Sequence, residues 1–414
     1  MQTIDNESPA FDPESAQTGC PVDHTLWSQQ KTTRASEPGP RVERENGRWH
    51  VRGFEEARAL LRSSDTRQAG FGAGFLERMH NSNAPILYQE GKVHQQQRKQ
   101  TARFFTPKAV SSNYRQLMER LVDQLIATLQ RDKRSDLSQM TLTLAVQVAA
   151  GVVGLTNSHL PGMDRRLDAF FKQPDKNAGR LARLWQRLHI NRWRALMFFY
   201  LDVKPAIKAR KRQPQEDVIS HLLSLNYTDT EILTECMTYA AAGMATTREF
   251  ISLAAWHFME HPALRAHYLS ASEAERQKIL EETLRLEPVV GNLYRRTTEA
   301  IHLESNGKPV MIPQGELVNI DIYQANRDET AVGVRPEMLC PARTLKDERI
   351  LQAVMGFGDG HHRCPGSYIA IQESDIFLQR LLALDELHIR RPPTVTWNDL
   401  VTGYELRNFI ITLA

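Results

Sequence analysis

The stretch FGDGHHRCPG, residues Phe357 to Gly366, decides how this sequence is interpreted. It places Cys364 between glycines and directly ahead of a helix-type pattern from Tyr368 to Ile371. Backbone N–H groups and the positive end of a following helix both favour a thiolate over a thiol. The stretch therefore indicates a sulfur that binds a metal or acts as a nucleophile.

Four kinds of site could be formed by this stretch. Zinc held by His361, His362 and Cys364 is disfavoured, because no second cysteine stands at zinc-ribbon spacing. A Cys-His nucleophile lacks any protease signature. A phosphate-binding loop needs a third glycine and a long preceding strand. The remaining interpretation is a haem iron bound by the Cys364 thiolate, whose electron donation favours O–O cleavage.

At every fixed position the stretch matches Phe-Gly-x-Gly-x-His-x-Cys-x-Gly, and in this it resembles the cysteine loop of the cytochrome P-450 family. Three weaker segments stand in the family's order: Glu282-x-x-Arg285, residues 326–343 as its meander, and a helix with Ala242, Gly243, Thr246 and Thr247 as its oxygen-binding helix. The resemblance covers about residues 40 to 414. It implies a haem b cofactor and a long central helix over the haem.

The pattern along the chain predicts a fold that is mainly α with a minor β portion (α+β). Residues 1–40 are rich in Ser, Thr, Pro and Gln and are expected to be a mobile tail, followed by one domain over 41–414. The chain is nearly all helical from Phe54 to about residue 290, after a short hairpin at 41–51, and strand-like over 301–322. A capping box at Thr228 begins the longest helix, which Pro262 ends.

Composition excludes several classes of protein. The chain has 414 residues, 41% hydrophobic and 24% charged, with a net charge of +3, which argues against a nucleic-acid binder. Four scattered cysteines fit a reducing compartment, and the N-terminus lacks a signal-peptide pattern. The longest apolar run, 142–155, is too short to cross a bilayer. We expect a cytoplasmic protein without a transmembrane segment.

The resemblance also assigns roles to individual residues. It implies a buried structural triad of Glu282, Arg285 and Arg343. It implies that the haem propionates are held by His94, Arg98, Arg295 and His362. It implies further cofactor contacts from Ala242, Gly243, Phe357, Gly358 and Gly366. Weaker substrate-facing candidates are Phe71, Phe75, Met244, Val289, Val290, Asn292 and Leu293.

One position departs from the family. An acid usually precedes the threonine of the long helix and relays protons, but here that position is Ala245, which cannot transfer a proton. Thr246 and Thr247 are the expected catalytic hydroxyls, and Glu249, one turn beyond Ala245, is the nearest acid. Either Glu249 or the substrate would then relay protons, or the enzyme would use peroxide.

Charge is unevenly distributed. Residues 162–212 hold 14 Lys and Arg against four Asp, a net +10 that leaves −7 for the rest. In the family this segment is the lid over the substrate channel, and it could attract an anionic substrate, an acidic carrier protein or a membrane, or be a solvated face. Seven interleaved residues are expected to face the channel or the core: Phe170, Phe171, Leu184, Trp185, Trp193, Phe198 and Phe199.

The predicted function is a monooxygenase of secondary metabolism that inserts one atom of dioxygen into a small organic substrate. Electrons would come from a separate ferredoxin-type donor and its reductase, because no reductase domain is attached. Such a donor would dock on four basic residues: Lys99, Arg103, Lys108 and Arg363. The alternatives are a haem-thiolate enzyme that performs oxidative coupling, desaturation, rearrangement or peroxide-driven oxidation, and a non-catalytic haem sensor.

Overall fold

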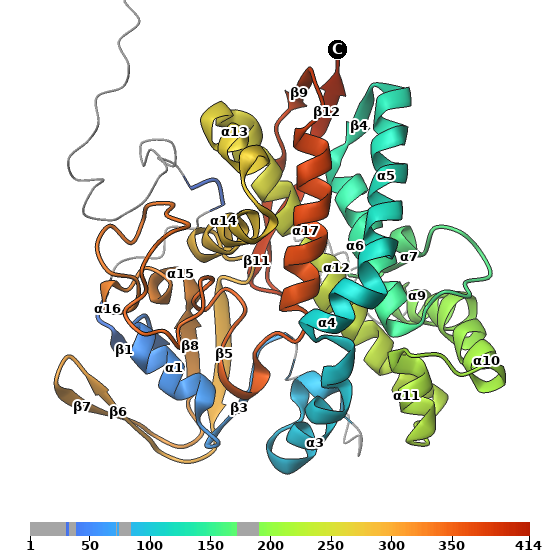
Figure 1. Cartoon of the computed structure of the whole chain (residues 1–414). Helices are drawn as coiled ribbons and strands as arrows, with labels where there is room; N and C mark the ends of the chain where they lie inside the picture. The colour runs from blue at the N-terminus through green and yellow to red at the C-terminus, as the bar shows by residue number, and fades with distance from the viewer. Residues whose placement is uncertain (1–29, 33–38, 72, 74–83, 172–189) are drawn as a thin grey trace, which may run out of the picture.

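The computed structural model describes residues 30–32, 39–71, 73, 84–171 and 190–414. Helices make up most of this part of the chain, and the small sheets lie to one side of them (Figure 1). The prediction of a mainly α fold with a minor β portion is confirmed.

The α-helices among the described residues are α1 (Phe54–Arg62), α3 (Gly91–Thr101), α4 (Pro107–Ala109), α5 (Arg115–Asp132), α6 (Leu137–Val153), α7 (Met163–Phe171), α9 (Asn191–Phe198), α10 (Lys204–Arg212), α11 (Val218–Ser224), α12 (Asp229–Glu260), α13 (Pro262–Ser270), α14 (Glu273–Leu286), α15 (Ile322–Ala325), α16 (Glu329–Val332) and α17 (Ser367–Leu382). Short 3-10 or π turns are η4 (Ile86–Tyr88), η5 (Ala102–Phe104), η6 (Val110–Tyr114), η8 (Phe199–Val203) and η9 (Gly360–His362).

The strands are β1 (Val42–Glu45), β2 (Arg48–Val51), β3 (Thr66–Gln68), β4 (Arg134–Asp136), β5 (Asn292–Thr297), β6 (Ile301–Ser305), β7 (Lys308–Ile312), β8 (Leu317–Asp321), β9 (Leu387–Arg391), β10 (Thr394–Asn398), β11 (Gly403–Arg407) and β12 (Ile410–Leu413). They form a five-stranded sheet ordered β1-β2-β8-β5-β3, a three-stranded sheet β4-β12-β9, and the pairs β6-β7 and β10-β11. The predicted hairpin around Asn46-Gly47 is the antiparallel pair β1-β2.

Helix α12 runs through the interior of the molecule. It begins at the predicted capping box, in which the Thr228 hydroxyl accepts from the Glu231 N–H and the Glu231 carboxylate accepts from the Thr228 N–H. Its 32 residues span about 48 Å at 1.5 Å each. Helices α6 and α17 pack along it and hold its middle, where the predicted site residues lie.

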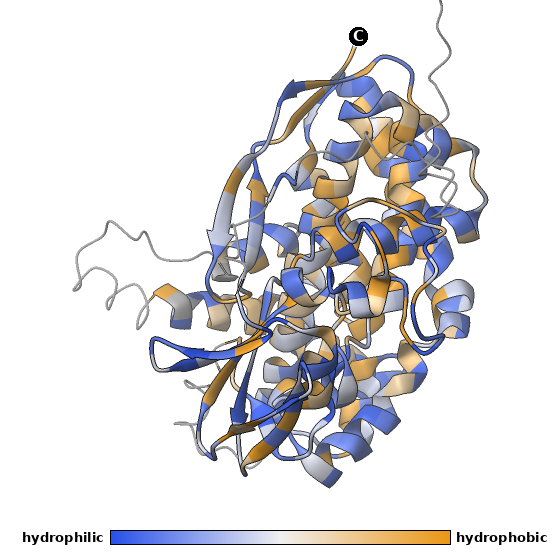
Figure 2. Ribbon diagram, turned by 90° about the vertical axis from the view of Figure 1, so that its left-hand side faces the viewer, coloured by the Kyte–Doolittle hydropathy of each residue, from blue (hydrophilic) through white to orange (hydrophobic). Residues whose placement is uncertain are grey.

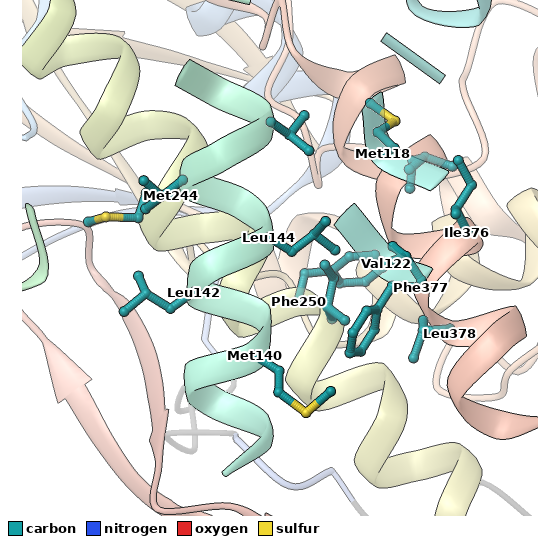
Figure 3. Close-up of a cluster of buried hydrophobic side chains, with 14 of the residues drawn as sticks. Met118, Val122, Met140, Leu142, Leu144, Met244, Phe250, Ile376, Phe377 and Leu378 are labelled. Atoms are coloured by element: carbon teal, nitrogen blue, oxygen red, sulfur yellow. The ribbon is translucent and has the colours of Figure 1, made fainter. Parts of the chain in front are cut away.

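The hydrophobic core lies between these helices. Hydrophobic residues concentrate on the inner helices, while the outer ones have mixed faces (Figure 2). In Figure 3, Val122 of α5, Leu144 of α6, Phe250 of α12 and Phe377 of α17 converge, and all four are buried. Because one core joins α5, α6, α12 and α17, the residues that these helices present to the site have a rigid support.

Two findings concern the predicted absence of a transmembrane segment and the predicted N-terminal tail. None of the helices in the described residues is long and apolar enough to cross a membrane. Thr32, in the expected tail, donates its hydroxyl to the buried Glu287 carboxylate at 2.6 Å, and the N–H groups of Lys31 and Thr32 donate to the same carboxylate. These residues therefore belong with the folded body, while the domain division at residue 40 stays a prediction.

Candidate active site

The cysteine loop is fastened to α1 through glycine and aspartate. Gly360 has a φ of +66°, and a Cβ there would lie 2.1 Å from the carbonyl oxygen of Leu61, so only glycine fits. Asp359 accepts two hydrogen bonds of 3.1 Å from Arg62. The Cys364 N–H donates to the Phe357 carbonyl at 2.9 Å. This loop therefore presents the sulfur from a fixed backbone, just ahead of α17.

The electrostatics of Cys364 differ from the sequence-based expectation. Burial raises the pKa of the Cys364 thiol, and this effect outweighs the lowering by the Gly366 backbone N–H, Arg98 and Arg363. The predicted stabilisers are thus present, but the loop alone does not make a thiolate. A bound metal ion would supply the missing stabilisation, because a coordinated thiol is deprotonated.

The four residues expected to hold propionates gather beside this loop. The rings of His94 on α3 and His362 stack with centroids 4.2 Å apart. Arg98, one turn after His94, donates to the Arg363 carbonyl, and its charge acts on both Cys364 and Tyr239 of α12. Arg98 therefore lies between the cysteine loop and the long helix.

Burial weakens two of these cations. It lowers the pKa of His94 to about 4, so this imidazole is neutral at physiological pH. It lowers the pKa of Arg295 on β5 to about 10. Arg295 donates to the Gln68 side chain and to the Tyr294 carbonyl. In the described part of the chain this buried guanidinium donates hydrogen bonds only to neutral acceptors, which suits an anionic partner.

Sequence reasoning missed Glu90 in this cluster. Its Oε2 lies 3.0 Å from His362 Nε2, and its Oε1 accepts from the Gln68 N–H at 2.7 Å. Charge from His362 and Arg295 helps to lower the pKa of Glu90 against the opposing effect of burial. No local pattern marks Glu90, because its partners are 22 to 272 residues away.

The predicted triad has the expected geometry. Arg285 makes a bidentate pair with Glu282 at 2.7 and 2.8 Å, and Arg343 approaches the same carboxylate at 3.2 Å. Both arginines also donate to carbonyls of the segment 326–338. The Cys340 N–H donates to Glu282 as well. The three side chains thus fix the meander ahead of the cysteine loop.

The middle of α12 turns two different faces to its surroundings. Ala242 is exposed, and the partly exposed Thr246 donates its hydroxyl to the Ala242 carbonyl at 2.6 Å. This is the one-turn bond by which threonine competes with the helix ladder. Gly243 faces the other way, since a Cβ there would meet Ala149 of α6 at 3.4 Å. Its direct contact with a cofactor is not supported, and its small size serves helix packing.

Met244 also corrects the sequence-based list. Its side chain is buried and lines an apolar pocket between α6, α7 and α12 together with Val146 and Leu167. Figure 3 shows Met244 beside α6. Met244 therefore belongs to the core between the helices and is not placed as a substrate contact on the face of Ala242.

Glu249 is a second correction. Its Oε1 accepts from Arg248 at 2.9 Å and from Arg407 of β11 at 2.6 Å, and its Oε2 accepts from the Leu406 N–H at 2.6 Å. Both oxygens are used, and the side chain is buried. Arg248 continues the network to Asp168 of α7 at 2.6 Å. Glu249 therefore ties α12 to neighbouring elements and is not available as a proton relay.

A carboxyl group that sequence reasoning missed lies beside Thr247. Glu373 of α17 is buried and bonds to the Thr247 side chain, while its Oε2 has no partner among the described residues. Burial raises the pKa of Glu373 to about 8, so it carries a proton at neutral pH. No sequence pattern marks Glu373 as a site residue, because α17 has the pattern of an ordinary amphipathic helix.

The other substrate candidates are spread over two segments. Phe71 is partly exposed and has a φ of +54°, and Phe75 lies outside the described residues. Val289 is part of the core, and Val290 bridges to Gly403. These positions give no clear substrate surface.

The start of β5 supplies two further candidates. The Asn292 side chain donates to that of Asn319 on β8 at 3.1 Å, which turns it to the sheet. Leu293 lies closest to the cysteine loop, 3.7 Å from where a Gly358 Cβ would stand. Of the substrate candidates, Leu293 is thus the one placed beside the loop.

The basic residues fall on two surfaces. Lys99, Arg103 and Lys108 are exposed on α3, η5 and α4, and Arg363 of the cysteine loop is partly exposed. Of the lid residues, 172–189 with Leu184 and Trp185, and the side chains of Phe170 and Phe171, lie outside the described residues.

The remaining lid residues point in different directions. Phe198 is buried and Phe199 partly buried, but Trp193 is 62% exposed. Trp193 thus corrects the expectation that all of these side chains face the channel or the core.

Comparison with known proteins decides the family. The family model "Cytochrome P450" matches residues 276–398, which include the triad, the meander and the cysteine loop. The biotin biosynthesis cytochrome P450 of Bacillus subtilis is 27% identical over 343 residues, covering 81% of this chain and 82% of the relative. The chain belongs to the cytochrome P450 family.

Other relatives place this P450 among bacterial monooxygenases. The cytochrome P450 monooxygenase PikC of Streptomyces venezuelae is 26% identical and covers 84% of this chain and 81% of its own. The structure of P450BioI in complex with acyl carrier protein ligated to hexadec-9Z-enoic acid superposes with a TM-score of 0.71 at 25% identity, covering 88% and 92% of the two chains. This P450 is accordingly an oxidoreductase of the monooxygenase class.

The residues of this P450 fit the haem that the family implies. Cys364 offers a free thiol, and Arg98 and Arg295 offer guanidinium groups that no carboxylate in the described residues pairs within 4 Å. Ala242 is exposed and Thr246 partly exposed, which leaves a face of small residues uncovered in the middle of α12. A thiolate ligand, cations for two propionates and a close helix face are the donor set that haem requires.

Proposed function

We propose that this P450 inserts one atom of dioxygen into a small organic substrate and takes electrons from a separate ferredoxin-type protein and its reductase. The single observation that carries the proposal is the position of Arg98, whose charge reaches both Cys364 and Tyr239 of α12. It brings the cysteine loop and the cation cluster next to helix α12. The exposed Lys99, Arg103 and Lys108 would receive the acidic donor.

Haem bound here would supply dioxygen activation on a thiolate-ligated iron. The chain's own residues have defined tasks. Cys364 Sγ is the ligand, and Arg98, Arg295 and His362 would bind propionate oxygens. The Thr246 hydroxyl faces the same side as Ala242, so it is placed to hold a proton at Oγ1 once it leaves the Ala242 carbonyl.

The test of the ligand is the spectrum of the reduced, carbon-monoxide-bound protein. The wild type should give a Soret band at the thiolate position, and Cys364→His should move it to the imidazole position. A wild-type band at the imidazole position would exclude Cys364 as the ligand.

Proton delivery should come from the α17 side. Ala245 carries no proton and Glu249 is fully engaged, whereas Glu373 is protonated at neutral pH and bonds to Thr247, next to Thr246. Glu373 would hold the proton at one oxygen and pass it through the threonine hydroxyls. General acid catalysis of this kind is worth about 10² to 10⁴ in rate.

The test compares product formed per electron consumed. Glu373→Gln should lower this ratio, and Ala245→Asp in the same chain should restore part of it. Glu235→Gln is the matched control, because Glu235 of α12 is also buried with a raised pKa, of about 7, but bonds to Ile86 and Gln97. Equal ratios in Glu373→Gln and the control would remove the proposed role.

A second outcome of the chemistry is favoured by Ala245. The alternative reaction is coupling or desaturation of the substrate without insertion of oxygen. Product mass after turnover with labelled dioxygen separates the two, since insertion adds one labelled atom.

We further propose that the substrate arrives on an acidic carrier protein. The support is the net +10 of residues 162–212 and the similarity to P450BioI, which was solved with an acyl carrier protein. A carrier-bound substrate should produce the substrate-induced spectral change at lower concentration than the free acid, and the difference should shrink as salt is raised. Equal affinities at low salt would refute delivery by a carrier.

A further inference from the structure

One helix face in the lid region carries hydrophobic side chains into solvent. Helix α9, the π turn η8 and helix α10 follow one another without a break over 191–212. Trp193, Leu196 and Tyr200 are 62%, 46% and 54% exposed, and they stand at i, i+3 and i+7, which places them along one face. We call these three side chains the apolar stripe.

Positively charged residues follow the apolar stripe in the direction of α10. Lys204 Nζ lies 4.9 Å from the centre of the Tyr200 ring, so the ammonium group stands at the end of the stripe. Lys208, one turn further on, is exposed, as is Arg192 beside Trp193. Within the described residues no carboxylate forms an ion pair with Arg192, Lys204 or Lys208. The cations at both ends are thus unneutralised.

The one acidic residue of this segment does not neutralise its positive charge. Asp202 is the only acid between 191 and 212, and it is buried against Arg166 at 2.6 Å. The stripe therefore lies in a positive field, which attracts an anionic surface and suits a charge-steered, transient complex.

The composition and size of the patch fit a protein partner. Trp, Tyr and Arg are the residues that most often carry binding energy in protein interfaces, and here they form a small centre with charges around it. A membrane-binding helix instead presents a broad apolar face to lipid. The broad apolar face of this helix is already used by the core, since Phe198, Val203 and Ile207 are buried. Only the narrow stripe is left outside.

We infer that the apolar stripe with Arg192, Lys204 and Lys208 is the docking surface for the acidic carrier protein that brings the substrate. The inference rests on the carrier-bound substrate proposed above and adds the place of contact. Helix acids of the carrier would meet the lysines, while its apolar side chains cover Trp193 and Tyr200.

The test measures binding of a fluorescently labelled acyl carrier protein, loaded with a hexadec-9-enoyl chain, to the haem-loaded full chain. Two double variants address the surface: Lys204→Glu with Lys208→Glu, and Trp193→Ala with Tyr200→Ala. The matched control is Lys308→Glu with Met311→Ala, an exposed basic and apolar pair on the hairpin β6-β7, which lies on the opposite side of the molecule (Figure 1).

Each surface variant should raise the Kd for the carrier by about tenfold or more, and the lysine variant should also lose most of the salt dependence. The control should bind like the wild type. The spectral change induced by free hexadec-9-enoic acid should stay within about twofold in all variants, because the substituted side chains lie on the outer surface of the molecule.

The outcomes separate the two proposals. If the wild type binds the carrier and all variants do so equally, the docking surface is refuted and carrier delivery stands. If the wild type does not bind the carrier, delivery by a carrier is refuted. If the stripe variants lose binding only to phosphatidylglycerol vesicles, the surface contacts membrane and the inference is overturned.

Discussion

Replacing Glu373 by glutamine should make the protein more stable, and increasingly so at higher pH. The carboxyl group is 2% exposed, bonds to Thr247 and leaves Oε2 without a partner in the described part of the chain. Burial raises its pKa from 4.5 to about 8. Glutamine has nearly the same shape and can keep the bond to Thr247 without ever carrying a charge.

The sign follows from proton binding. Between pH 4.5 and about 8 the folded state holds a proton on Glu373 that the unfolded state has lost, so wild-type stability falls as pH rises through this window. At 1.36 kcal/mol for each unit, the loss is about 3 kcal/mol at pH 7 and approaches about 5 kcal/mol above pH 8. The advantage of Glu373→Gln should therefore be absent near pH 4.5 and grow up to pH 8.

The assay is the thermal midpoint of the haem-loaded protein between pH 5 and 9. For a chain of 414 residues, 1 kcal/mol corresponds to about 1 °C, so the variant should gain about 3 to 5 °C at pH 8 to 9 relative to pH 5. Glu235→Gln should show the same trend over a narrower range, because its pKa is about 7. A gain in Glu373→Gln that is constant with pH would show that the carboxyl group is not held neutral by burial.

Other replacements test the supports of the site. Arg343→Met should lower stability by about 3 to 5 kcal/mol and speed haem loss, measured by transfer to apomyoglobin, because a buried carboxylate and several carbonyls lose their donor. Gly360→Ala should prevent haem incorporation, whereas Gly307→Ala, with the same positive φ but open space around it, should cost only about 1 kcal/mol in urea unfolding. Thr32→Val should lower the thermal midpoint by about 1 to 3 °C through the lost bond to Glu287.

Features with a local signal could be predicted from sequence. The capping box at Thr228 fixes the start of α12, and the turn at Asn46-Gly47 fixes β1-β2, because both depend on residues three or fewer apart. The cysteine loop was recognised for the same reason, since its glycines and Cys364 lie within ten residues. Gly360 adds a long-range cause, the backbone of α1, that the motif alone did not reveal.

The direction in which a residue of a helix faces could not be predicted from the sequence. Met244 and Gly243 stand in the motif of the long helix, yet both face α6, since a helix turns 100° per residue and the motif gives no direction. Trp193 was expected to face the channel or the core because it is interleaved with the basic residues of 162–212. Only the packing of Phe198 and its neighbours shows that the inner face was already occupied.

Glu249 and Glu373, the two acids near the threonines that are predicted to be catalytic, illustrate the same limit. Glu249 lies on the expected helix at a plausible spacing, but three hydrogen-bond donors occupy its two oxygens. Glu373 comes from another helix, 124 residues after Glu249, and its burial in the neutral form costs several kcal/mol near neutral pH, with one oxygen left without a partner in the described residues. A buried group that lowers stability in this way is typical of a functional site rather than of a structural one. With Ala245 unable to carry a proton, the direction of supply should be from α17 inward.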